Sequence, residues 1–123
     1  MADHNEFGNL AEEMAVDFLT KMGCTILKRN FRYQKAEIDI IALYKNEILI
    51  VEVKARSTDV FLEPQEAVNK RKIKLIVMAA NEYMNKGNRT EEVRFDIISV
   101  LPDAAGKLQI THLENAFEAF DAN

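Results

Sequence analysis

Charged residues interrupt two neighbouring apolar segments at a spacing that could build a reactive site. Glu37 and Asp39 lie at the start of the first segment, and Glu52 and Lys54 lie at the end of the second. Side chains two residues apart point to the same face of a β-strand, so each pair is expected to share a face. Burying such charges without partners costs several kcal/mol each, so they require neighbours of opposite charge or an ion.

A tight turn at residues 45–46 is expected to join the two segments as an antiparallel hairpin. Asp39 then lies across from Glu52. Their two carboxylates and the backbone carbonyl of Val53 supply the hard oxygen ligands that suit Mg²⁺ or Mn²⁺. A cation held there would polarise a phosphate, while Lys54 would orient the nucleophile or offset developing negative charge. The pattern predicts metal-assisted hydrolysis of phosphodiester bonds, with Asp39, Glu52 and Lys54 as catalytic residues.

The alternative is that Glu52 and Lys54 only form ion pairs on a solvated strand end, which is common for an isolated Glu-x-Lys sequence. Two features favour the catalytic interpretation. Glu-Ile-Asp precedes it on the paired strand, and residues 48–51 are all apolar, which is typical of a strand covered on both faces.

The elements that position these residues follow from hydrophobic periodicity and turn signals. Helices are expected at residues 9–22 and 64–86, with Gly23 and Gly87 as their ends, and a terminal helix at residues 113–120. Strands are expected at residues 24–31, 37–44, 47–54, 93–101 and 108–112. The strand–helix–strand connection from residue 47 to 101 predicts parallel neighbours. The predicted fold is α/β, a single mixed β-sheet flanked by helices.

Glu12 and Glu37 are further acidic candidates. On a helical wheel Glu12 lies at the border of the apolar stripe and Glu13 points away from it, so Glu12 is the better candidate to face inward. A capping box formed by Asn9 and Glu12 is an equally weighted alternative. Glu37 is a weaker candidate as an additional metal ligand.

Basic residues are clustered although the net charge is −4. Local patches of positive charge can attract phosphate despite a negative total. The residues expected to contact nucleic acid are Arg29, Arg32, Arg56 and Lys72. Lys72 lies on the apolar side of its helix, where the alternative is that its aliphatic stem covers apolar surface while the ammonium reaches water.

Length and composition restrict the remaining classes. A chain of 123 residues suits one domain, and 48% apolar with 29% charged residues is a globular balance. No signal peptide or membrane-spanning run is evident, and one cysteine cannot form a disulfide framework. A cytoplasmic protein without membrane contact is therefore expected.

Six short motifs together resemble the YraN-like family of uncharacterised bacterial proteins, from Gly8 to about Val100. They are Gly8-Asn-Leu-Ala-Glu12, Leu27-Lys-Arg-Asn-Phe-Arg32, Ala36-Glu-Ile-Asp-Ile-Ile-Ala42, Val51-Glu-Val-Lys-Ala-Arg56, Pro64-Gln-Glu-Ala-Val68 and Arg94-Phe-Asp96. The resemblance implies a restriction-endonuclease-like fold, related to archaeal Holliday junction resolvases and the PD-(D/E)xK nucleases. Asp39, Glu52 and Lys54 match the catalytic positions of that pattern, and Glu12 matches an acidic residue of the first helix. Ala36 departs from it, since the family usually has Gly there.

The expected function is therefore a Mg²⁺- or Mn²⁺-dependent endonuclease acting on DNA, including branched or damaged DNA. Two alternatives are a nucleic-acid-binding module with this fold and little catalysis, and a structural partner subunit. The sequence leaves the oligomeric state open, with a homodimer among the alternatives.

Overall fold

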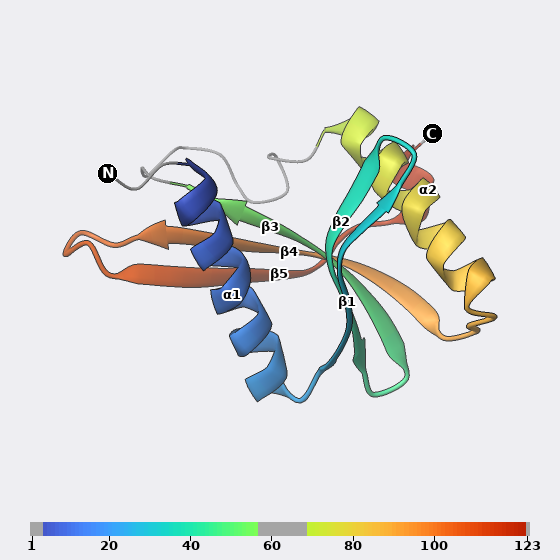
Figure 1. The fold of residues 1–123 in the computed structure, drawn as a ribbon, viewed down its shortest axis with the longest axis horizontal. Helices are drawn as coiled ribbons and strands as arrows, with labels where there is room; N and C mark the ends of the chain where they lie inside the picture. Colours follow the sequence, from blue (N-terminus) through green and yellow to red (C-terminus); the bar gives the residue numbers. More distant parts are fainter. Residues whose placement is uncertain (1–3, 57–68, 123) are drawn as a thin grey trace.

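The computed structural model describes residues 4–56 and 69–122, and within them the strands form one five-stranded sheet (Figure 1). The strand order follows the chain, β3 and β4 are parallel, and the other neighbours are antiparallel. The predicted mixed sheet flanked by helices is therefore confirmed. In chain order the elements are α1 (His4–Met22), β1 (Thr25–Tyr33), β2 (Ala36–Tyr44), β3 (Glu47–Ala55), α2 (Lys70–Lys86), β4 (Glu92–Pro102), β5 (Leu108–Phe117) and the 3₁₀ helix η2 (Ala119–Ala122).

A helix covers each face of the sheet, which explains why the central strands are apolar at consecutive positions. Along β3, Ile48 and Ile50 pack in the core beneath α2, whereas Leu49 and Val51 pack in the core beneath α1. All four side chains are buried, as the apolar run in the sequence predicts. From the helices, α1 contributes Ala11, Ala15 and Leu19, and α2 contributes Ile76, Ala79, Ala80 and Met84.

The first helix is longer than its apolar pattern predicts, because it begins at His4 rather than residue 9. Its end is confirmed at Gly23, whose φ of 108° suits a glycine after a helix. Cys24 follows it into the core, where burial raises the pKa of its thiol. None of the helices in the described ranges has the length and apolar content that a bilayer crossing requires.

The second helix starts later than its sequence predicts. Asn69 has extended backbone (φ −84°, ψ 173°), and its side chain accepts a hydrogen bond from the backbone N–H of Lys72. It therefore caps a helix that begins at Lys70, and a continuous helix from Pro64 is wrong. Pro64 itself lies outside the described residues.

The expected terminal helix over residues 113–120 is also wrong. β5 continues to Phe117, and only the 3₁₀ turn η2 follows it. Phe117 instead pairs with Phe95 of β4, with ring centroids 5.0 Å apart. Between Phe95 and Ile97 the register shifts, and Asn115 within the shifted segment has a φ of 53°.

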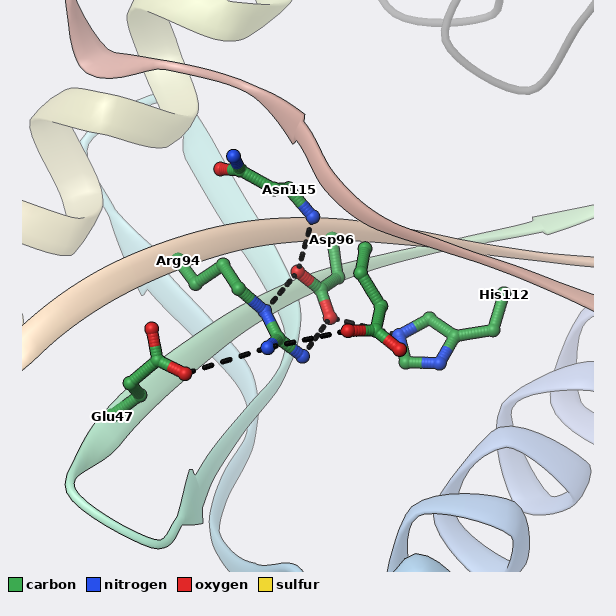
Figure 2. Close-up of polar contacts among 6 residues, drawn as sticks. Glu47, Arg94, Asp96, His112 and Asn115 are labelled. Atoms are coloured by element: carbon green, nitrogen blue, oxygen red, sulfur yellow. Dashed lines mark hydrogen bonds and ion pairs between the residues drawn. The ribbon is translucent and has the colours of Figure 1, made fainter.

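A buried carboxylate, Asp96 of β4, gives the physical reason for this strand (Figure 2). It is fully buried and accepts a hydrogen bond of 3.0 Å from the backbone N–H of Asn115. Arg94 binds both its oxygens at 2.9 Å, and Nε2 of His112 lies 2.8 Å away. Burial alone would raise the pKa of Asp96, but the hydrogen bonds from His112, Arg94 and Asn115 hold the pKa below its ordinary value. The need to satisfy this carboxylate outweighs the helical propensity of residues 113–120.

The bulge in β5 predicts the effect of two substitutions at Asn115. A left-handed conformation suits Gly, so Asn115→Gly should leave the free energy of unfolding nearly unchanged. Asn115→Val should lower it by roughly 1–2 kcal/mol, because a β-branched residue is strained there. Urea denaturation of both variants measures the order. If the segment were helical, Gly would be the more damaging residue.

Candidate active site

The site begins where β2 stops pairing with β3. Their register runs from Tyr44 opposite Glu47 to Ile40 opposite Val51 and ends there. Beyond that point Oδ2 of Asp39 accepts a hydrogen bond of 2.8 Å from the backbone N–H of Val53. The N–H and C=O of one strand residue point to the same side, so the Val53 carbonyl faces the same gap. We call this gap, bordered by Asp39, Glu52 and Val53, the strand fork.

A sharp twist of the outer hairpin opens the strand fork. Ile38 packs in the core under α2 and Ile40 in the core under α1, although they lie two residues apart. The pairs of β1 with β2 pass from Arg29–Ile40 to Phe31–Ile38, and Asn30, which lies between them on β1, has a φ of 54°. The positive φ of the β1–β2 turn falls on Gln34, so Ala36, where a Gly was expected, fits within the buried core.

Two carboxylates meet at the strand fork, as predicted from the hairpin. The Asp39 carboxyl lies close enough to Glu52, whose side chain is only 6% exposed, for the two groups to repel each other. Burial and then repulsion from Glu52 raise the pKa of Asp39 to about 8, although the Val53 N–H opposes this. Asp39 therefore holds its proton more tightly than an ordinary aspartate does.

Two lysines neutralise Glu52. The ammonium of Lys54 lies 3.4 Å from Oε2 of Glu52, and that of Lys72 from α2 contacts the same oxygen. Burial, and then the neighbouring Lys72, lower the pKa of Lys54. Burial also acts to lower the pKa of Lys72, but its contacts with Glu52 raise it overall. The ammonium of Lys72 is thus directed at a buried carboxylate rather than reaching into water alone.

A cleft of about 210 Å³ lies beside Asp39, between α1 and the end of β3. We call it the acidic cleft; it is lined by Gly8, Asn9, Glu12, Asp39, Val53 and Ala55. The side chain of Glu12 is 15% exposed and that of Glu13 is 64% exposed, which confirms that Glu12 faces inward. Because α1 begins at His4, Asn9 is not a helix cap, and the capping-box alternative is wrong.

Arg29 holds Glu12 in the acidic cleft. Its Nε and Nη2 atoms lie 3.0 Å and 2.7 Å from Oε2 of Glu12, and Nη2 also contacts Glu13 at 2.7 Å. The candidate phosphate ligand Arg29 therefore already has two carboxylate partners. It orients an acid at the border of the site.

Two other predicted residues, Glu37 and Arg56, make contacts that do not involve the residues of the strand fork. Glu37 does not share the environment of Asp39, contrary to the expectation, because the twist at Asp39 places Glu37 in a second cleft. There it pairs with Arg32 at 3.3 Å. Arg56 directly follows β3, and its backbone N–H donates to the carbonyl of Val100.

Sequence reasoning missed two cations of this second cleft, Lys35 and Arg71. Lys35 and Arg71 both belong to clusters of basic residues in the sequence, but nothing in their spacing shows that the β1–β2 turn lies against α2.

The donors at the strand fork fit a hard divalent cation such as Mg²⁺ or Mn²⁺. Across the ranges 4–56 and 69–122, no group of three or more Asp, Glu, His and Cys side chains is placed to hold a metal. A cation at the strand fork would have two carboxylates and the Val53 carbonyl as its protein donors, all oxygens, and water would complete the coordination.

Comparison with known proteins gives a consistent family. The model of a family described as "Uncharacterised protein family UPF0102" matches residues 11–100. A UPF0102 protein of Christiangramia forsetii is 46% identical over 98% of this chain and all of its own. Another of Flavobacterium psychrophilum is 47% identical over the same shares, and one of Bacteroides thetaiotaomicron is 45% identical over 95% of this chain and 96% of its own.

Two solved structures are distantly similar to the fold. The structure titled "Crystal structure of SSO0001" has a TM-score of 0.46 and 13% identity, and covers 98% of this chain. Pyrococcus furiosus SfsA, solved in complex with Ca²⁺, has a TM-score of 0.40 and 12% identity, and covers 89% of this chain. The chain spans 57% and 61% of the length of those two proteins.

The raised pKa of Asp39 predicts how stability depends on pH in metal-free buffer. The folded state holds the proton more tightly than the unfolded state. This contribution is therefore full below about pH 4, the ordinary aspartate pKa. It is lost as the pH rises to about 8. Asp39→Asn cannot ionise, so its advantage in Tm over the wild type should grow across this window.

We expect the variant to be more stable than the wild type by at least about 1 kcal/mol at pH 8, which is roughly 4 °C in Tm. Thermal melts in EDTA at pH 5, 6.5 and 8 measure it. Asp17→Asn, on the exposed face of α1, is the matched control and should show no such trend. A pH-independent difference for Asp39→Asn would contradict the assignment.

Proposed function

The chain belongs to the uncharacterised protein family UPF0102, the YraN-like group, and we propose that it is a divalent-metal-dependent endonuclease that hydrolyses phosphodiester bonds in DNA. The observation that carries this proposal is the strand fork. There two mutually repelling carboxylates, a backbone carbonyl and a lysine meet at the end of a buried strand. A structural ion pair would need no second carboxylate beside Glu52.

Asp39, Glu52 and the carbonyl of Val53 would hold the cation. When bound, it supplies Lewis-acid polarisation of the phosphate and activation of water. The protein residues supply the other contributions. Asp39 holds a proton in the metal-free state because its pKa is raised, and it would release this proton when the cation binds. Glu12 adds negative charge from the α1 side of the acidic cleft.

Lys54 is the group placed to stabilise the transition state. Its ammonium lies beside Glu52 at the strand fork, and its side chain is about a quarter exposed, so a phosphate can approach it. Charge grows on the attacked phosphate during hydrolysis, and a preorganised donor in a partly dry site stabilises that charge more than water would. Lys72 shares Glu52 with Lys54 and is available to a phosphate from the α2 side.

DNA is proposed as the substrate, including branched or damaged DNA, because the fold implied for the family that the motifs resemble is related to archaeal Holliday junction resolvases. The second candidate is a nucleic-acid-binding module without turnover. The observation in its favour is that the described ranges contain no group of three acidic, His or Cys ligands at the strand fork. The two variants below separate these functions.

Calorimetric titration with Mn²⁺ should detect a site that Asp39→Asn largely removes, because one of two carboxylate ligands is lost. Glu37→Gln is the matched control: it removes a nearby carboxylate that lines the second cleft, and it should leave the heat of binding unchanged. Equal heats for the wild type and Asp39→Asn would remove the strand fork as the metal site. Loss of binding in Glu37→Gln would show that the ligand set is wrong.

Lys54→Met keeps the aliphatic stem and removes the charge. If Lys54 stabilises the transition state, single-turnover cleavage of DNA in Mn²⁺ should slow by about 10² or more. DNA affinity should change far less, and the melting temperature shows whether the variant is folded. Under the ion-pair interpretation, stability would fall and activity would follow only the amount of folded protein. A folded Lys54→Met protein that cuts at the wild-type rate would exclude this mechanism.

A further inference from the structure

A second cleft, larger than the acidic cleft, opens between the β1–β2 turn and the start of α2. Its volume is about 360 Å³, at the lower end of the range for small-ligand pockets. Its walls include Lys35, Ala36, Arg71, Lys72, Leu75 and Ile76, and we call it the basic cleft. Lys72 lines it and also contacts Glu52, so the basic cleft adjoins the strand fork.

The basic cleft carries an excess of positive charge. Its lining contains three cations, Lys35, Arg71 and Lys72, and one acid, Glu37, which Arg32 already pairs. Within the described ranges no carboxylate forms an ion pair with Lys35 or Arg71, and both residues are exposed. The chain as a whole has a charge of −4, so this local excess is not a general property of its surface.

The position of these cations on α2 is unfavourable for the isolated protein. The helix starts with Lys70, Arg71 and Lys72 and has no acid in its first turn. The N-terminus of a helix carries positive partial charge and favours anions, so a cation there without an acidic partner is destabilising. An anionic ligand between Arg71 and Lys35 would interact favourably with both cations and with the helix N-terminus.

The floor of the basic cleft is apolar. Ala36 and Ile76 are each 3% exposed, and Leu75 is half-buried beside them. Inorganic phosphate would make no favourable contact with such an apolar floor. A nucleotide would contact both parts of the cleft, because its phosphate can pair with the cations and its flat base can pack on the apolar side chains.

We propose that the basic cleft binds one unstacked nucleotide of the substrate strand, next to the phosphate at the strand fork. Lys35 and Arg71 hold its phosphate, and its base lies against Ala36, Leu75 and Ile76. This assignment rests on the proposed function for the chemistry at the neighbouring phosphate. In an intact duplex each base is stacked and paired, and extruding one costs a few kcal/mol, least where it is already unpaired. The preferred substrate is therefore DNA with a single-stranded segment beside the cut.

Binding is measured first, in EDTA so that no strand is cut. The probes are a fluorescein-labelled single-stranded oligonucleotide and a blunt duplex of the same length. The wild type should bind the single strand at least about ten times more tightly, a difference of roughly 1.4 kcal/mol. Arg71→Ala and Lys35→Ala should each weaken single-strand binding by about five- to tenfold.

Lys74→Ala is the matched control, because Lys74 is exposed on α2 and does not line the basic cleft. It should change single-strand affinity by less than about twofold, as expected for a distant surface charge. An effect of Lys74→Ala equal to that of Arg71→Ala would overturn the proposal, and so would equal affinity for the duplex.

A base analogue tests the apolar floor. A single strand containing 2-aminopurine fluoresces more when that base leaves its stack, and the aliphatic lining of the basic cleft has no ring to quench it. The wild type should raise the fluorescence at saturation, and Leu75→Ala, checked for folding by its melting curve, should reduce the rise. No change with the wild type would overturn the assignment of the base.

Cleavage in Mn²⁺ of the same probes, and of a duplex that carries a single-stranded arm, separates this proposal from the proposed function. A protein that binds the single strand through Arg71 but cuts none of the three substrates would support the basic cleft and exclude the nuclease. A protein that cuts, with single-strand binding unaffected by Arg71→Ala and Lys35→Ala, would overturn the basic cleft and leave the nuclease standing.

Discussion

The hydrogen bond from the Val53 N–H to the Asp39 carboxylate is the contact on which the site depends. A strand residue normally satisfies its N–H with the backbone of its neighbour, and β2 provides that neighbour only as far as Ile40. The side chain of Asp39 replaces the missing backbone carbonyl, so β2 can diverge from β3 without leaving a buried N–H group unpaired. The same exchange places a carboxyl group beside Glu52, where burial and repulsion raise the pKa of Asp39 to about 8.

Where β2 and β3 separate, acidic and basic side chains lie on opposite sides of the sheet. On the α1 side, Glu12 and Asp39 line an acidic cleft, and Arg29 fixes Glu12 from the neighbouring strand. On the α2 side, Lys35, Arg71 and Lys72 line a basic cleft. Glu52 and Lys54 lie between them. A metal would therefore be expected on one side of the sheet and a polyanion on the other, and the phosphate at which they meet would be the reacting one.

Local sequence patterns predicted the elements of this arrangement but not how they bend. The turn at residues 45–46, the shared face of Glu52 and Lys54 and the approach of Asp39 to Glu52 all follow from strand periodicity. The twist at Asp39 depends on Asn30 and on packing against two different helices, so no window of sequence contains it. The final strand was predicted from residue 108, but its end, residues 113–117, was predicted as a helix for a similar reason, because Asp96 lies far from Asn115 in the sequence.

The contacts within the site differ in how far apart their residues lie in the chain. β1, β2 and β3 form a continuous meander between Thr25 and Ala55, with each strand paired to the next. β3 and β4 are parallel, and their pairing of Glu47 with Glu92 must close a long loop that includes α2. Short-range pairings of this kind form faster than long-range ones, and an emerging chain folds from its N-terminal side first. Asp39 and Glu52 are thus expected to meet before Lys72 reaches them, and the docking of α2 completes the charge balance late in folding.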